Sequence, residues 1–189
     1  SLYSKNKQGW FSWVYEQLNI KEGQKILEIG CGDGTLWAKD KGKLPAHVEV
    51  VLSDISDGML RDARRTIGTT DERFHFRVFP AQKIPYGENE FDLVVADHVL
   101  FYCEDVEKAC QEIRRVLKPG GILICSTYGN EHMKEVSELV GKFDDRIVLA
   151  AEKLYERFGR ENGEEILKPF FECVEWKEYE DYLLVSEPE

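Results

Sequence analysis

A glycine-rich turn near the start of the chain has the clearest chemical meaning of any stretch in the sequence. It reads Glu28-Ile-Gly-Cys-Gly-Asp-Gly34, with glycines at positions 30, 32 and 34. Glycines let the backbone turn tightly and let a ligand approach it without meeting a Cβ atom. Two acids sharpen the pattern: Glu28 lies two residues before the first glycine, and Asp54 ends the next apolar run, where a ribose diol would find an acceptor. The pattern therefore predicts a site for a ribose-bearing ligand.

The elements that position this turn are predicted from hydrophobic periodicity, because short apolar runs alternate with stretches of helical spacing. The predicted strands are Lys25–Ile29, Val48–Ser53, Phe74–Val78, Phe91–Ala96 and Ile122–Ser126. The predicted helices are Gln8–Leu18, Ser56–Ile67 and Asp105–Leu117, followed by a forced turn at Lys118-Pro-Gly-Gly121. This alternation indicates an α/β fold in which helices cover both faces of a mostly parallel sheet.

Ligands of such sheets bind beyond the carboxyl ends of the strands. We therefore expect the chemistry in the residues that directly follow each strand. These are Gly30–Gly34, Asp54, Pro80–Gln82, Asp97–Tyr102 and Thr127–His132.

The C-terminal third has a different pattern. Glu131–Val140 and Asp145–Phe158 have helical spacing, and Phe171–Val185 alternates as a sixth strand would. Only four residues follow, too few for a seventh strand. We expect the natural protein to continue past Glu189; the alternative is a sixth strand paired directly with the fifth.

Composition limits the class of protein. The 189 residues fit one domain, with an N-terminal helix or lid in residues 1–20 and a substrate-side region in residues 130–189. No apolar run is long enough to span a bilayer, and the first residues contain no signal-peptide core, so we expect a cytoplasmic protein that binds no membrane. The formal net charge of −11 argues against nucleic acid as a partner. The five cysteines include no CxxC pair and suggest no metal site. The oligomeric state is left open.

Five motifs together resemble the class I S-adenosylmethionine (SAM) dependent methyltransferases, in their small-molecule, type 11-like branch. The resemblance covers Lys25–Ser126: the glycine turn, then VLSDISDGML, then FPAQKIPYGENEFDLVVADHVLFY, which spans two motifs, and EIRRVLKPGGILICST. It implies a Rossmann-like fold, and the chain as given would lack the last strand of the family's sheet.

The resemblance also implies roles for residues. Gly30, Cys31, Gly32 and Gly34 would lie under the methionine and ribose of the cofactor, with Glu28 orienting the turn. Asp54 would accept the ribose hydroxyls, Ile55 would cover the adenine face, and Ala81 and Gln82 would meet the adenine edge. Asp97 and His98 would lie next to the methyl group, and an oxygen acceptor would lose its proton to His98 as general base. Placement alone suggests Tyr102, Tyr128 and His132 as walls of the substrate pocket.

One departure from the family concerns Pro80. The family often has an aspartate there that accepts from the adenine amino group, and a proline side chain cannot accept. The contact must then come from Gln82, a backbone carbonyl or water.

Two other functional classes remain open. An NAD-dependent oxidoreductase uses a similar turn, but its GxGxxG pattern would need a small residue where this chain has Thr35. A non-catalytic SAM-binding module has the same motifs. The fourth strand is followed by no NPPY-type tetrapeptide, which favours a small-molecule acceptor over a nucleobase or a glutamine amide.

The assignment of the glycine turn and Asp54 to SAM leads to a direct prediction. SAM and S-adenosylhomocysteine should bind, and NAD should not. Asp54→Ala should weaken binding by on the order of 1.5–3 kcal/mol, because a charge-assisted hydrogen bond is lost. Calorimetric titration with the three ligands measures both effects, and unchanged affinity in the variant would contradict the ribose assignment.

Overall fold

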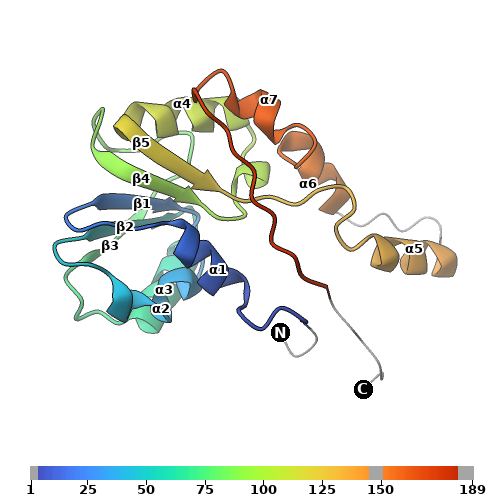
Figure 1. Cartoon of the computed structure of the whole chain (residues 1–189), viewed down its shortest axis with the longest axis horizontal. Helices are drawn as coiled ribbons and strands as arrows, with labels where there is room; N and C mark the ends of the chain where they lie inside the picture. The colour runs from blue at the N-terminus through green and yellow to red at the C-terminus, as the bar shows by residue number, and fades with distance from the viewer. Residues whose placement is uncertain (1–3, 145–150, 183–189) are drawn as a thin grey trace.

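The computed structural model describes residues 4–144 and 151–182, and in these ranges it forms five parallel strands in one sheet (Figure 1). The strand order is β3-β2-β1-β4-β5. The strands are β1 (Lys25–Ile29), β2 (Glu49–Asp54), β3 (Phe74–Val78), β4 (Phe91–Ala96) and β5 (Leu117–Cys125). The predicted Rossmann-like α/β fold is confirmed.

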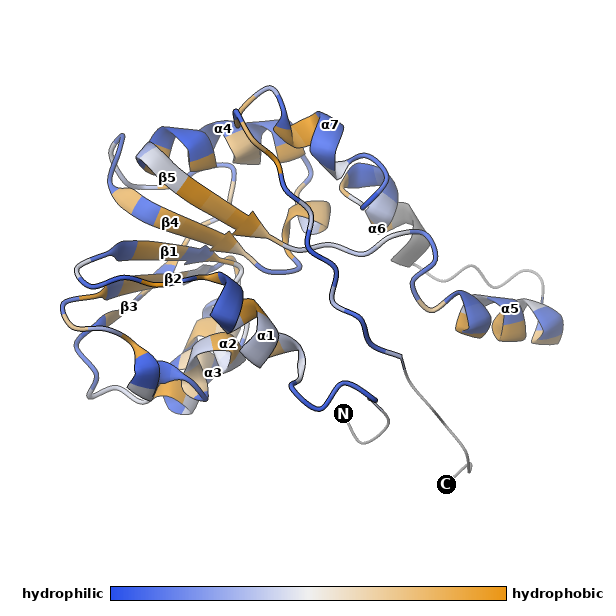
Figure 2. Ribbon diagram, viewed as in Figure 1, coloured by the Kyte–Doolittle hydropathy of each residue, from blue (hydrophilic) through white to orange (hydrophobic). Residues whose placement is uncertain are grey.

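Helices cover both faces of the sheet because successive residues of each buried strand point in opposite directions. In β1, Ile26 packs in a cluster with side chains of α1 (Trp10–Gln17), α2 (Thr35–Ala38) and α3 (Asp57–Ile67). The neighbouring Leu27 packs in a second cluster with α4 (Val106–Val116) and α7 (Gly163–Leu167). Figure 2 shows mostly hydrophobic colouring along β4 and β5, interrupted by hydrophilic residues, and side chains buried on both faces of the central strands fit a sheet covered on both faces.

Side-chain caps mark the starts of α3 and α4. The Ser56 hydroxyl accepts from the backbone N–H of Met59 at 3.3 Å, and the Asp105 carboxylate accepts from that of Lys108 at 2.8 Å. Both are N-caps that satisfy free backbone donors. Because α3 begins at Asp57, directly after β2, Asp54 is held at the start of this turn.

The predicted turn at residues 118–121 lies inside β5 rather than before it. Phe91 pairs with Leu117, but Leu93 pairs with Ile122, so the extra residues are accommodated by an irregularity within the strand. Gly120 has a φ of +76°. The turn residues therefore bend the strand locally instead of ending it.

The C-terminal third differs from the sequence-based expectation. Helix α5 covers Lys134–Phe143 instead of 131–140, and the described part of the helix predicted from residue 145 is α6 (Ala151–Arg157). Two short 3-10 helices, Lys41–Lys43 and Leu100–Tyr102, were not predicted.

The predicted sixth strand is wrong for residues 171–182, which pair with no strand; residues 183–185 lie outside the described range. The segment runs without regular structure from α7 towards the N-terminal residues (Figure 1). Val174 packs against the hydrophobic core and Glu175 is exposed, but Trp176 is 44% exposed, so the alternation of residue types is not matched by alternate burial. Single residues of this segment, such as Val174, therefore pack on the body of the protein, and the segment has no buried strand face.

No helix in the described ranges is long and apolar enough to cross a membrane.

The close packing at Gly34 generates a stability prediction. Its φ is +77°, and a Cβ atom there would lie 2.8 Å from Ile67 Cδ1 and 3.2 Å from Ala63 Cβ. Gly34→Ala should lower the free energy of unfolding by roughly 1–3 kcal/mol, through overpacking and backbone strain. Urea denaturation measures it. Gly42→Ala is the matched control, because a Cβ there meets nothing within 4 Å; equal losses in both variants would contradict the packing argument.

Candidate functional site

The carboxylate of Asp54 ties the glycine turn to the end of β2. Asp54 Oδ2 accepts from the backbone N–H of Gly32 at 3.0 Å, and Oδ1 accepts from that of Ser56 at 2.8 Å. The backbone N–H of Cys31 donates to the carbonyl of Ser53 at 2.9 Å. Each carboxylate oxygen keeps lone-pair capacity for a further donor, so Asp54 can support the turn and still accept from a ligand.

Gly32 is the point where this turn is open. Its φ is +55°, and a Cβ atom built there meets nothing within 4 Å. At Gly30, by contrast, a Cβ atom would collide with the side chain of Val99. The absence of a side chain at Gly32 therefore leaves a cradle where a ligand can approach the backbone.

Glu28 is buried within β1, with only 2% of its surface exposed. Its Oε2 accepts from Trp37 Nε1 at 2.7 Å. Burial raises the pKa of Glu28 to about 8, while the hydrogen bond from Trp37 opposes that rise. The carboxyl group is therefore neutral at pH 7, and its contact with Trp37 joins β1 to α2 beneath the turn.

Asp97 is a buried carboxylate at the end of β4. Its Oδ1 accepts from Ser126 Oγ at 2.5 Å, and Trp10 Nε1 lies 3.2 Å from Oδ1 and 3.1 Å from Oδ2. Burial alone would raise the pKa of Asp97, but hydrogen bonds from His98, Ser126 and Trp10 outweigh it and hold the pKa below its ordinary value. The group stays ionised in a largely apolar setting.

The imidazole of His98 is oriented by that carboxylate. His98 Nδ1 lies 3.1 Å from Asp97 Oδ1, and the backbone N–H of His98 donates to Ser126 Oγ at 2.8 Å. A neutral imidazole that donates through Nδ1 has its lone pair on Nε2. The Asp97–His98 pair therefore presents a proton acceptor at the carboxyl end of the sheet.

The three predicted substrate-wall residues lie in one aromatic cluster with His98. The His98 ring stacks on Tyr128, with centroids 4.3 Å apart, and Tyr128 stacks on His132 at 4.0 Å. Tyr102 is 63% exposed and packs against Phe101, whose ring centroid lies 6.1 Å from that of Tyr128. Burial, and then the nearby His98, lower the pKa of His132.

The residues expected around a purine have different exposures. Ile55 is 75% exposed next to Asp54, so its side chain is available to a ligand. Ala81 is buried in the core, which leaves only its backbone for contact. Gln82 is half-buried, and its amide makes no hydrogen bond in the described part of the chain. Cys31 is buried, and burial raises the pKa of its thiol, which makes it a poor nucleophile.

Two residues join the site that sequence reasoning did not assign to it. Trp10 lies in the N-terminal helix or lid that the sequence predicts for residues 1–20, but nothing in the sequence indicated that its indole would contact Asp97. Ser126 was the last residue of a predicted strand, and its hydroxyl instead lies between Asp97 and His98. The described residues contain no group of three or more side chains suited to a metal ion.

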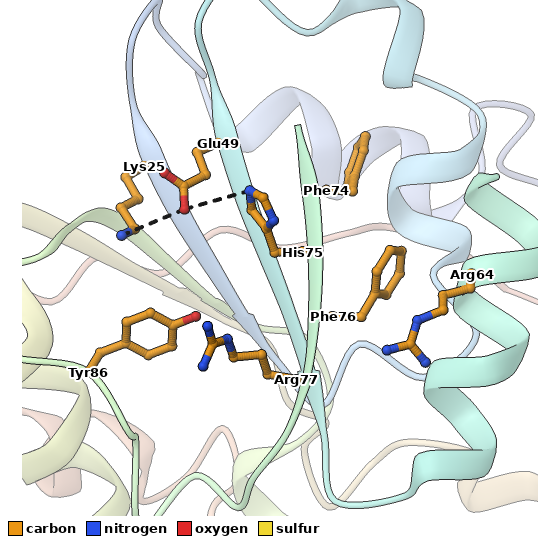
Figure 3. Close-up of a pocket in the computed structure, with 8 residues that line it drawn as sticks. All are labelled: Lys25, Glu49, Arg64, Phe74, His75, Phe76, Arg77 and Tyr86. Carbon is orange, nitrogen blue, oxygen red and sulfur yellow. Dashed lines mark ion pairs between the residues drawn. The ribbon is translucent and has the colours of Figure 1, made fainter. Parts of the chain in front are cut away.

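A hollow of about 540 Å³ lies elsewhere, beside the edge strand β3 (Figure 3). It includes Lys25 and Glu49, which begin β1 and β2, together with His75 of β3. Glu49 lies 3.6 Å from Lys25 Nζ and 3.8 Å from His75 Nε2. Lys25 and Glu49 lie at the amino ends of their strands, whereas ligands of parallel sheets bind at the carboxyl ends. This hollow is therefore separate from the candidate site.

Comparisons with known proteins agree with this geometry. The sequence profile of the family described as "Methyltransferase domain" matches residues 27–125. The ubiquinone/menaquinone biosynthesis C-methyltransferase UbiE of Haemophilus ducreyi is 30% identical over 142 residues, which are 74% of this chain and 54% of that protein. The chain thus spans about half the length of this relative.

Two solved structures are similar in fold. Phosphoethanolamine N-methyltransferase 2 of Haemonchus contortus, in complex with SAM, has a TM-score of 0.65 and 26% identity, over 86% of this chain and 36% of that one. A putative methyltransferase of Haloferax volcanii, in complex with the Trm112 activator, has a TM-score of 0.64 and 20% identity, over 83% of this chain and 65% of that one.

The raised pKa of Glu28 predicts how stability depends on pH. In the unfolded chain the carboxyl ionises near its ordinary value of 4.5, while in the folded protein it stays protonated up to about pH 8. The stabilising contribution of the neutral group is therefore complete below pH 4.5 and is lost as the pH rises towards 8. Glu28→Gln keeps an acceptor for Trp37 and removes this titration.

We therefore expect the free energy of unfolding of the wild type to fall relative to that of Glu28→Gln as the pH rises through this window. Urea denaturation at a series of pH values measures the difference. Glu22→Gln, at an exposed position, is the control. A difference between wild type and Glu28→Gln that does not change with pH would show that Glu28 is not buried as a neutral acid.

Proposed function

The chain belongs to the methyltransferase-domain family of class I SAM-dependent enzymes, and we propose that its candidate site binds SAM and transfers the methyl group to a small-molecule acceptor. The observation that carries this proposal is the Asp97–His98 pair. It presents a proton acceptor beside the strand ends where the open glycine turn and Asp54 are positioned.

The residues at the carboxyl ends of β1 and β2 fit the cofactor. The cradle at Gly32 admits the sugar and methionine portions, and Asp54 has acceptor capacity for two vicinal hydroxyls. The exposed Ile55 offers an apolar face to a purine, and the free amide of Gln82 offers the polar contact that Pro80 cannot. When bound, SAM supplies a methyl group already activated for displacement.

The chain's own residues then have to align the acceptor and exclude water. Trp10 and Tyr128 pack against the His98 ring at centroid distances of 4.7 and 4.3 Å. These rings shield the imidazole, while Asp97 fixes its orientation. With a hydroxyl acceptor, His98 Nε2 would take the proton that the acceptor loses as its oxygen bonds to the methyl carbon and the carbon–sulfur bond of SAM breaks, which leaves S-adenosylhomocysteine.

A small-molecule acceptor is supported by the walls of the site and by the relatives. Tyr102, Tyr128 and His132 offer planar surfaces for a compact organic acceptor. The printed names of the two relatives above refer to ubiquinone or menaquinone biosynthesis and to phosphoethanolamine, both small molecules. All five cysteines are free, which supports a reducing, cytoplasmic setting.

The test begins with the acceptor. Metabolite extracts are incubated with SAM and the protein, and masses that increase by one methyl group are identified. A chain that binds SAM and methylates nothing in such pools would instead be a non-catalytic SAM-binding module.

For a hydroxyl acceptor, His98→Asn should lower kcat by ~10²–10⁴, the usual contribution of a general base, and should leave SAM affinity nearly unchanged. Asparagine suits this position because His98 has a φ of +53°, a conformation that asparagine tolerates well. His47→Asn is the matched control: His47 is exposed on a different loop and has a φ of +56°. Equal losses of rate and of SAM affinity in His98→Asn would make His98 a cofactor-positioning residue.

A further inference from the structure

The hollow beside β3 differs in charge from the chain as a whole. The chain has a formal net charge of −11, whereas the hollow is lined by three cationic side chains and by one carboxylate, that of Glu49. The cations are Lys25, Arg64 and Arg77. A basic surface on an acidic protein attracts negatively charged partners and repels further copies of the same acidic chain.

Two of these cations are available to a partner. The guanidinium carbon of Arg64 lies 5.1 Å from the centroid of the Phe76 ring, and that of Arg77 lies 5.5 Å from the centroid of the Tyr86 ring. In the part of the chain that the structure describes, neither guanidinium forms an ion pair or a hydrogen bond. Both therefore keep the paired donors with which arginine binds a carboxylate.

The hollow lies along an open edge of the sheet, because β3 pairs with β2 and with no other strand in the described ranges. The backbone N–H of Val50 in β2 donates to the carbonyl of Arg73 at 2.8 Å. In a parallel ladder, alternate residues direct both backbone groups to the same neighbour, so the odd-numbered residues of β3 face β2. The backbone groups of Phe76 and Val78 point to the open side, where an added strand can pair with them.

The side chains of β3 alternate between the two sides of this edge (Figure 3). Phe76 points to the side of α3, where Arg64 lies over its ring, while His75 and Arg77 point to the opposite side. Val78, which is 52% exposed, has the same parity as Phe76. A strand added to this edge thus meets Arg77 on one side and a partly apolar surface on the other.

We propose that the open edge of β3 is a docking site for an extended, acidic segment of a partner protein, which adds a strand to the sheet. Backbone hydrogen bonds to the edge supply affinity, and alternating side chains supply specificity: carboxylates for Arg77 on one side, aliphatic groups for Phe76 and Val78 on the other. The proposal concerns a surface separate from the candidate site and does not depend on the proposed function.

A second copy of this chain fits the edge less well than an acidic segment does. A two-fold pairing of β3 with β3 brings the Arg77 side chains of both copies to the same side of the joined sheet. Like charges on neighbouring strands destabilise such a pairing. Charge therefore favours a partner that carries carboxylates where this strand carries cations.

The test uses a peptide with blocked ends, EVEVEVE, whose carboxylates all lie on one face when it is extended. Peptide KVKVKVK reverses the charge, and EEEEVVV has the same composition without the alternation. Fluorescence anisotropy measures the affinity of each labelled peptide, and NMR follows amide hydrogen exchange at Phe76 and Val78. We expect EVEVEVE to bind about tenfold more tightly than either control, because only it offers charge-assisted hydrogen bonds in the strand pattern, and to slow exchange at both amides.

Arg77→Gln should weaken the binding of EVEVEVE about tenfold, since a hydrogen bond between charged groups is lost. Arg65→Gln is the matched control: it removes the same charge from an exposed position on α3 outside the hollow, and should leave the affinity unchanged.

Three results overturn the proposal: no binding of EVEVEVE, equal affinity for EVEVEVE and EEEEVVV, or binding that leaves exchange at Phe76 and Val78 unchanged. Equal affinity would mean that the hollow is a basic patch without strand recognition. Sedimentation velocity of the protein alone tests the remaining occupant. A dimer in which exchange at these two amides is already slow would show that the edge takes a second copy of this chain, which also overturns the proposal.

Discussion

The buried carboxylate of Asp97 accepts hydrogen bonds from three separate parts of the chain, and the arrangement of the site depends on it. Trp10 comes from α1, Ser126 directly follows β5, and His98 follows Asp97 itself. A buried charge is costly unless it is paired and hydrogen-bonded, so these donors have little freedom to move away. The same contacts that stabilise the charge therefore fix the N-terminal helix over the sheet and fix the orientation of the imidazole. The hydrogen bonds to Asp97 therefore serve both the packing of α1 on the sheet and the orientation of the candidate catalytic residue His98.

A parallel sheet covered on both faces explains why the polar residues gather where they do. Its strands are apolar along most of their length, because an unpaired polar side chain buried between the helix layers would be destabilising. Polar side chains therefore gather at the carboxyl ends of the strands, which all lie at one edge of the sheet. Glu28 is the exception within a strand. It is tolerated because it is neutral when buried and because Trp37 donates to it. Its contact with Trp37 braces α2 and the glycine turn from below, whereas the other two acids of the site, Asp54 and Asp97, lie at the carboxyl ends of β2 and β4.

The bounds of β1, β3 and β4 were predicted to the residue, because each of these strands is a short apolar or alternating run with glycine, proline or polar residues at its ends. The sequence also placed His98, Tyr128 and His132 near one another, since the ends of parallel strands meet by geometry. The predicted sixth strand is wrong for residues 171–182, because alternation of residue types determines neither burial nor a pairing partner: Trp176, an apolar position of the pattern, is exposed. The contact of Trp10 with Asp97 could not be predicted either: it joins residues 87 positions apart through packing of α1, for which no local pattern exists.

The candidate site is completed by segments from opposite ends of the described chain. The sheet and its loops supply the glycine turn and both acids, but the ring over His98 comes from Trp10, and the ring against Trp10 comes from Tyr179. These two covering segments are held differently: α1 and the residue after it bury Val14 and Leu18 in a hydrophobic cluster of the sheet, whereas the Tyr179 ring has contacts with the rings of Trp10 and Trp13. Local opening costs least where few buried contacts must break. It follows that the segment of Tyr179 should open at a lower cost in free energy than α1, which the core and the contact of Trp10 with Asp97 hold on the sheet.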